Sequence, residues 1–197
     1  EVGVIVYGHG LLGSREEIKA KVWSRLAQQQ NYIFIATDWT GMSVHDQGTA
    51  ANAMKNISNF QGIGDRMHQG ILEFLLLGRS VKHRLADLQV LKDAGVKVNS
   101  DEVFYAGGSQ GGIYGQTVMA LSTQLTRGFL AVPGSNYATL LQRSVDFDKF
   151  MAVMQVSYSS PADRAIGIAC MQLMWDGTDP VSYAGHIEQD PLVADAP

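Results

Sequence analysis

The sequence predicts an α/β fold, a three-layer α/β/α sandwich with a mostly parallel sheet. Short apolar runs rich in β-branched residues alternate along the chain with longer segments of helical period. The connections between successive runs are long enough for the helical crossovers that parallel strands need. Glycine-rich segments follow two of the runs directly, at the carboxyl ends of strands where ligand sites form in such sheets.

The first strand is expected over residues 2–6, where a β-branched run ends in Gly-His-Gly. Ser14 and Glu17 have the spacing of a capping box. They introduce an amphipathic helix over residues 15–29, in which Ile18, Val22 and Leu26 recur at helical spacing. A second buried strand is expected over residues 32–39.

The remaining elements continue the alternation of strands and helices. Residues 49–94 are expected to be mostly helical, and residues 94–102, "AGVKVNSDE", are expected to form a turn-rich connector. A third strand over residues 102–106 leads into a helix, and residues 127–135 form a fourth strand. Helical segments are then expected over residues 140–143, 147–156 and 162–175, the last with Ile166, Cys170 and Leu173 in period.

Length and composition fit one domain over residues 1–197, with a helical, cap-forming portion at 140–197. The net charge is −4 and the 15 basic residues are scattered, which argues against binding to nucleic acid or to an anionic membrane surface. No apolar run approaches the ~20 residues that span a bilayer. Cys170, the single cysteine, rules out an internal disulfide and is expected to be a buried thiol.

Residues Gly107–Gly111 spell G-x-S-x-G with Ser109 at the centre. The motif follows a predicted strand and opens a predicted helix, which is the setting of a nucleophile elbow. The serine of such a turn has a strained backbone, so the residues two positions before and after it must be small. Ser109 is therefore predicted to be a catalytic nucleophile. A structural turn and a ligand-binding loop are the alternatives, although the glycine spacing matches neither G-x-G-x-x-G nor a P-loop.

The Gly8–Gly13 segment "GHGLLG" follows the first predicted strand and is a candidate oxyanion loop. Acyl transfer builds negative charge on the carbonyl oxygen, and backbone N–H groups aimed at that oxygen lower the barrier. We expect one N–H donor from Gln110, directly after the nucleophile, and the other from Leu11. His9 is expected to brace this loop rather than to act as a base. A plain glycine turn that leads into a helix is the alternative.

Together, "VYGHGLLGS" and "YAGGSQGG" resemble the α/β-hydrolase fold, and its lipase and esterase members in particular. The resemblance extends from Val2 to about Ser135. It implies Ser109 as the nucleophile, with Leu11 and Gln110 as the oxyanion donors. Gly108 departs from the family pattern, in which many members have His.

The family order also implies an acid and then a histidine after the serine. Only His186 follows Ser109, and "GTDPV" makes Asp179 its candidate acid. These two residues lie close together in sequence, and no further strand is predicted between them. We therefore expect the fold to be incomplete at both ends, with the acid and the base outside residues 1–197. A compact Asp179–His186 pair and the absence of a working triad are the alternatives.

The leading hypothesis is a serine hydrolase that cleaves a small-molecule or lipid carboxylic ester and needs no cofactor or metal. A peptidase or amidase on the same fold is the nearest alternative, because the motifs do not distinguish the leaving group. A non-catalytic binding module that keeps the fold is the alternative from another functional class.

Overall fold

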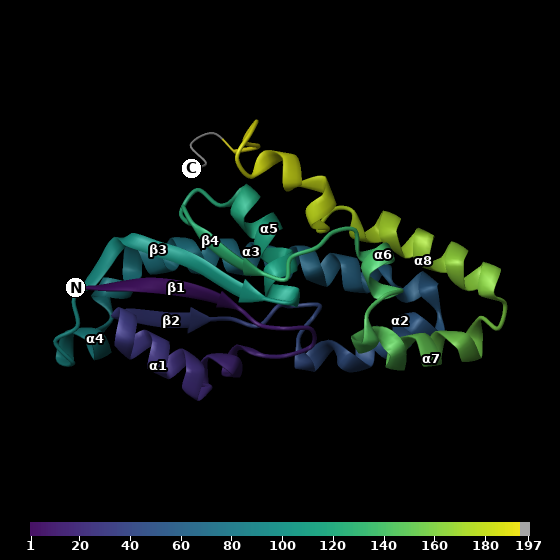
Figure 1. The fold of residues 1–197 in the computed structure, drawn as a ribbon, viewed down its shortest axis with the longest axis horizontal. Coiled ribbons are helices and arrows are strands. Elements are labelled where there is room, and N and C mark those ends of the chain that lie inside the picture. Colours follow the sequence, from purple (N-terminus) through teal and green to yellow (C-terminus); the bar gives the residue numbers. More distant parts are fainter. Residues whose placement is uncertain (194–197) are drawn as a thin grey trace.

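The structure, a computed structural model, describes residues 1–193, and its centre is a four-stranded sheet in which all neighbours are parallel (Figure 1). The strand order is β2-β1-β3-β4. The strands are β1 (Val2–Gly8), β2 (Tyr32–Ala36), β3 (Val98–Gly108) and β4 (Gly128–Ala131). The predicted fold class is confirmed.

Helices lie on both faces of the sheet, and one face is buried more deeply than the other. The helices are α1 (Lys21–Gln30), α2 (Gln47–Lys55), α3 (Gln61–Arg84), α4 (Gln89–Asp93), α5 (Gln110–Leu121), α6 (Tyr137–Leu141), α7 (Asp148–Ser157) and α8 (Pro161–Trp175). On the face towards α3 and α5, Val4 pairs with Val103 and Val6 with Tyr105, and all four are almost completely buried. On the opposite face α1 packs through Trp23 against Tyr7 and Phe34; Tyr7 is buried there, whereas Trp23 and Phe34 are only half-buried.

The helix expected over residues 15–29 consists of two separate pieces. A 3₁₀ helix covers Arg15–Lys19, and α1 begins only after Ala20, whose backbone is extended. The Ser14 hydroxyl accepts a hydrogen bond from the N–H of Glu16, as a helix cap does. The Glu17 carboxylate does not return to Ser14, because it bonds to the loop after β1 instead.

Three strand predictions also need correction, and one of them is the fourth strand, which covers Gly128–Ala131 and not all of residues 127–135. The second strand ends at Ala36, and its residues are half-buried rather than buried because β2 lies at an edge of the sheet. The third strand begins at Val98, within the expected connector, because Val98 pairs with Val2 across an irregularity in the β1–β3 register.

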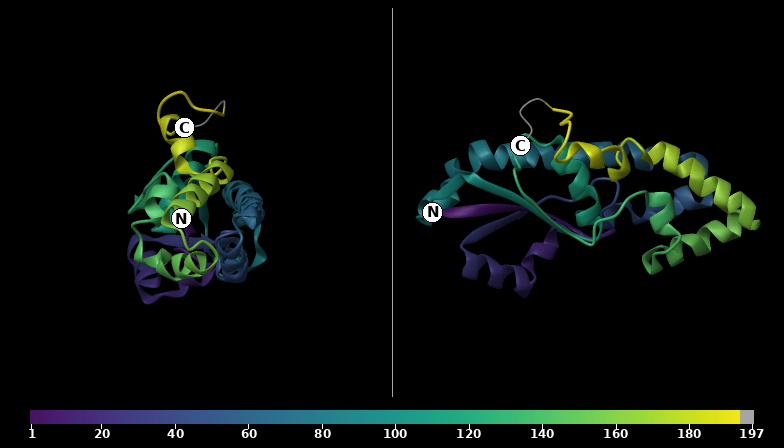
Figure 2. Two further views of the ribbon diagram at one scale, coloured as in Figure 1. Left: turned by 90° about the vertical axis from the view of Figure 1, so that its right-hand side faces the viewer. Right: turned by 45° about the horizontal axis from the view of Figure 1, so that its top comes forward.

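Helices α2, α6, α7 and α8 lie beyond the carboxyl ends of the strands (Figures 1 and 2). The helices expected from residue 140 onwards correspond to α6, α7 and α8. Residues 194–197 lie outside the described part of the chain.

The predicted orientation of α8 was wrong. Ile166, Cys170 and Leu173 face outwards, and Cys170 is an exposed thiol rather than a buried one. The buried side of the helix carries Gly167, where an added Cβ would overlap the Ile57 side chain. Because Gly167 has no side chain, this side of α8 can approach Ile57 closely, and it is the side that packs against the rest of the protein.

Candidate active site

Ser109 occupies the single position between the end of β3 and the start of α5. Its backbone has φ 54° and ψ −121°, a combination that L-residues adopt only under strain. Such a conformation costs of order 1–3 kcal/mol and persists only where the surrounding structure imposes it. The strand, the sharp turn and the helix thus have the geometry that a nucleophile elbow requires.

Close backbone contacts explain the glycines on either side of Ser109. A Cβ on Gly111 would overlap the carbonyl oxygen of Gly8, and a Cβ on Gly107 would overlap the carbonyl group of Gly111. Gly8 and Gly107 are also direct partners in the β1–β3 ladder. The two glycine motifs of the sequence therefore meet at one edge of the sheet.

His9 holds the Gly8–Gly13 loop through both of its ring nitrogens. Nε2 accepts a hydrogen bond from the N–H of Trp39 at 2.8 Å, and Nδ1 donates to the carbonyl of Gly10 at 2.7 Å. The ring is completely buried, and burial lowers its pKa below the ordinary value of 6.5. A neutral ring with both nitrogens engaged by backbone braces the loop and is not free to serve Ser109 as a base.

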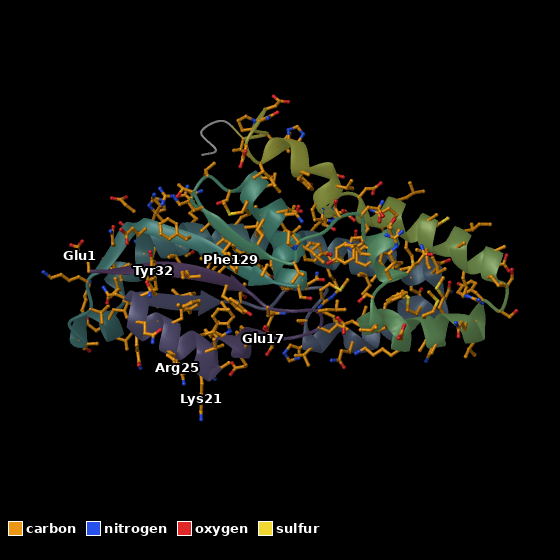
Figure 3. All side chains as sticks on the ribbon, viewed as in Figure 1. Glu1, Glu17, Lys21, Arg25, Tyr32 and Phe129 are labelled. Carbon is orange, nitrogen blue, oxygen red and sulfur yellow. The ribbon has the colours of Figure 1, made fainter. Side chains whose placement is uncertain are left out.

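Glu17 is a second brace of this loop, and sequence reasoning assigned it a different partner. Its carboxylate accepts hydrogen bonds from the N–H of Gly10 at 3.2 Å and from the hydroxyl of Tyr7 at 3.1 Å. Burial and the neighbouring Glu17 charge raise the pKa of Tyr7 to about 12, so the phenol remains a donor. Figure 3 shows Glu17 near the carboxyl ends of the strands. The spacing from Ser14 matched a capping box, and no sequence signal pointed to Gly10.

The two candidate oxyanion donors are left without acceptors in the described part of the chain. In the Gly8–Gly13 loop the N–H of Gly10 bonds to Glu17 and that of Leu12 bonds to Met42, which leaves the N–H of Leu11 between them. Gln110 begins α5, where a helix has no intrahelical acceptor for its N–H.

The Gln110 side chain is buried and connects the Ser109 turn to the helices beyond the sheet. Its Oε1 accepts a hydrogen bond from the Tyr137 hydroxyl, and Tyr137 stacks on Trp175 with ring centroids 4.2 Å apart. The Nε2 atom of Gln110 has no partner among residues 1–193. Tyr137 thus fixes the side chain of the residue that carries one candidate oxyanion donor.

Asp179 and His186 are not joined to each other. The fully buried Asp179 carboxylate accepts from the N–H groups of Tyr137 at 2.7 Å and Val181 at 2.9 Å, and from Nε2 of Gln172 at 3.0 Å. His186 contacts the carbonyl of Asp190 through Nδ1 instead. Across residues 1–193, no side chain forms a hydrogen bond with the Ser109 hydroxyl, and no group of three His, Cys, Asp or Glu residues is placed to hold a metal ion.

Comparisons with known proteins give a likeness of fold. No protein-family model matches the chain, and no curated protein matches it in sequence. Among solved structures it is similar to acetyl xylan esterase 1 from Thermoanaerobacterium sp. JW/SL YS485, with a TM-score of 0.60 and 13% identity. The match covers 96% of this chain and 57% of the esterase chain, so this chain spans little more than half of that protein's length. The chain therefore shares the α/β fold of that esterase.

Proposed function

We propose that the protein is a serine hydrolase that cleaves carboxylic esters through an acyl-enzyme on Ser109. The observation that carries the proposal is the strained backbone of Ser109 at a strand–helix junction, two residues before Gly111, which packs directly against Gly8. The likeness in fold to an acetyl xylan esterase supports it. No helix among residues 1–193 has the length and apolar character to cross a bilayer.

In the proposed reaction, Oγ of Ser109 attacks the ester carbonyl while its proton passes to a general base. Negative charge on the carbonyl oxygen is stabilised by the N–H groups of Leu11 and Gln110. Collapse of the tetrahedral species expels the alcohol, which takes up the proton, and water then releases the acid. The general base and its acid partner are proposed to come from outside residues 1–197. Residues 140–197 are proposed to form a cap over the site.

A covalent serine probe tests the proposal directly. In the full-length protein, a fluorophosphonate should label Ser109, and Ser109→Ala should abolish both the labelling and the hydrolysis of p-nitrophenyl acetate. Ser24→Ala, on the exposed side of α1, is the matched control and should label as the wild type does. Labelling that persists in Ser109→Ala would refute the assignment.

The alternatives give different outcomes with the same protein. A peptidase or amidase would label at Ser109 and cleave p-nitroanilides at least as well as p-nitrophenyl esters. A non-catalytic binding module would show neither labelling nor ester cleavage.

A further inference from the structure

A hydrophobic cavity lies between the carboxyl edge of the sheet and the helices beyond it. It is bounded by the Gly8–Gly13 loop, the loop after β2, and helices α2, α3, α6, α7 and α8. All of its lining side chains are apolar, and no polar atom faces the space; among them are Leu11, Ala50, Met54, Phe147, Phe150 and Met171. Its volume of about 30 Å³ has room for about two water-sized groups.

Leu11 connects this cavity to the site around Ser109. Its side chain lines the cavity, while its N–H is one of the two proposed oxyanion donors. A carbonyl oxygen bound at that N–H would therefore lie at a residue whose side chain already lines the cavity. The space is therefore suited to one of the two groups attached to the carbonyl carbon.

The chemistry of ester cleavage decides which group this is. The departing alkoxide must take up a proton and then leave the site, and a cavity with no polar atom provides no proton donor. The acyl group remains bound to Ser109 until water arrives and needs no polar partner. An apolar space beside the oxyanion loop therefore fits the acyl group.

We propose that this cavity is the acyl pocket and that it selects short acyl chains of about two to four carbons. This inference rests on the function proposed above. Phe147 and Phe150 form an aromatic pair in its lining, with centroids 6.0 Å apart. Longer chains would have to displace these rings. The expected substrates are esters of small apolar acids, not of long-chain fatty acids.

The test compares p-nitrophenyl acetate, butyrate and octanoate in the full-length protein. The wild type should favour acetate and butyrate over octanoate by about 10-fold or more in kcat/KM. Ala50→Phe fills the cavity from α2 and should lower kcat/KM for butyrate about 10-fold or more. Phe150→Ala enlarges the cavity and should shift the preference towards octanoate. Ala165→Phe, the same enlargement on the exposed side of α8, is the matched control and should leave the profile unchanged.

Fluorophosphonate labelling separates this inference from the proposed function. If Ser109 labels in every variant but the chain-length profile is the same in all of them, the cavity is not the acyl pocket and only this inference fails. If the wild type does not label at Ser109, the proposed function fails and the pocket assignment fails with it. Ala50→Phe and Phe150→Ala alter the cavity in opposite directions, so general damage to the fold cannot produce the expected pair of shifts.

Discussion

His9 and Glu17 both hold the backbone of the Gly8–Gly13 loop through hydrogen bonds to Gly10. One contributes a neutral ring bonded to Gly10 and Trp39, and the other a carboxylate bonded to the N–H of Gly10. Neither side chain accepts a hydrogen bond from the N–H of Leu11, which has no acceptor among the described residues. Preorganised donors stabilise developing charge without reorganisation during the reaction, so these two side chains are positioning residues for the proposed oxyanion hole.

The buried ring of His9 should make stability depend on pH. Its folded-state pKa lies below 6.5 because burial disfavours the charged ring, so the unfolded chain binds the proton more readily. The folded state should lose stability as pH falls below about 6.5, until the lowered pKa is reached. Urea unfolding between about pH 5 and 7.5 measures this, and His9→Gln should show a shallower fall because glutamine does not titrate. His83→Gln, on the exposed side of α3, should retain the wild-type slope, and an unchanged slope in His9→Gln would contradict the assignment.

Glu17 should affect the rate more than substrate binding. Glu17→Ala removes the acceptor for the Gly10 N–H, so the loop that carries Leu11 is held less firmly in the transition-state geometry. We expect kcat for p-nitrophenyl acetate to fall about 10-fold with little change in KM. Glu16→Ala, an exposed neighbour on the same 3₁₀ helix, is the control. A change confined to KM would argue against a positioning role.

At the scale of elements, Asp46 connects the loop after β2 to α3. Its buried carboxylate accepts hydrogen bonds from the N–H groups of Gly41 and Ser43, from the Ser43 hydroxyl, and from Nε of Arg66 at 2.9 Å. Burial alone would raise the pKa of Asp46, but the bonds from Ser43 and Arg66 outweigh it and lower the pKa. The stabilisation is therefore complete above the ordinary pKa of the carboxyl and is lost as pH falls through the lowered value.

Asp46→Asn should destabilise the fold because it leaves donors that only a carboxylate can satisfy together. The expected loss in unfolding free energy is about 2–4 kcal/mol at neutral pH. Asp65→Asn, on the exposed surface of α3, is the matched control and should change stability by less than about 0.5 kcal/mol. Chemical denaturation of the three proteins gives the comparison, and equal stability of Asp46→Asn and the wild type would show that the carboxylate is dispensable.

Sequence patterns predicted where strands and helices form better than they predicted which face of each element is buried. The β-branched run in β1 and the turn at Ser109 depend on local residue types, and they were predictable. The outward face of α8 was not, because Ile166 and Leu173 keep an apolar period that is independent of what packs there. The bond from Glu17 to Gly10 was equally inaccessible, since it depends on how a loop and a 3₁₀ helix meet in space.

At the scale of the whole molecule, Asp179 connects the helices beyond the sheet. It holds the start of α6 through Tyr137, the side chain of Gln172 on α8, and the turn at Val181. The sequence motif made Asp179 a candidate triad acid. Its use as an internal cap rather than as a partner of His186 follows from three-dimensional contacts that the motif does not encode.

Asp179→Asn distinguishes a structural carboxylate from a catalytic one. As a structural group, it should cost about 1–3 kcal/mol of unfolding free energy, while the folded variant still labels at Ser109 and retains most of its kcat. A triad acid would instead lower kcat by about 10⁴-fold with the fold intact. His186→Ala serves as the companion variant and should change neither stability nor kcat appreciably.

The central position of β1 determines the order in which this sheet can form. In sequence, 29 positions separate Val4 from its β2 partner Ile33, and 99 separate it from its β3 partner Val103. Closing the longer loop costs about 1 kcal/mol more in chain entropy. We therefore expect the β1–β2 pair to form more readily than the β1–β3 pair. The close contact between Gly111 and Gly8 spans a similarly long loop, so we expect the packing around the Ser109 turn to depend on the β1–β3 pairing.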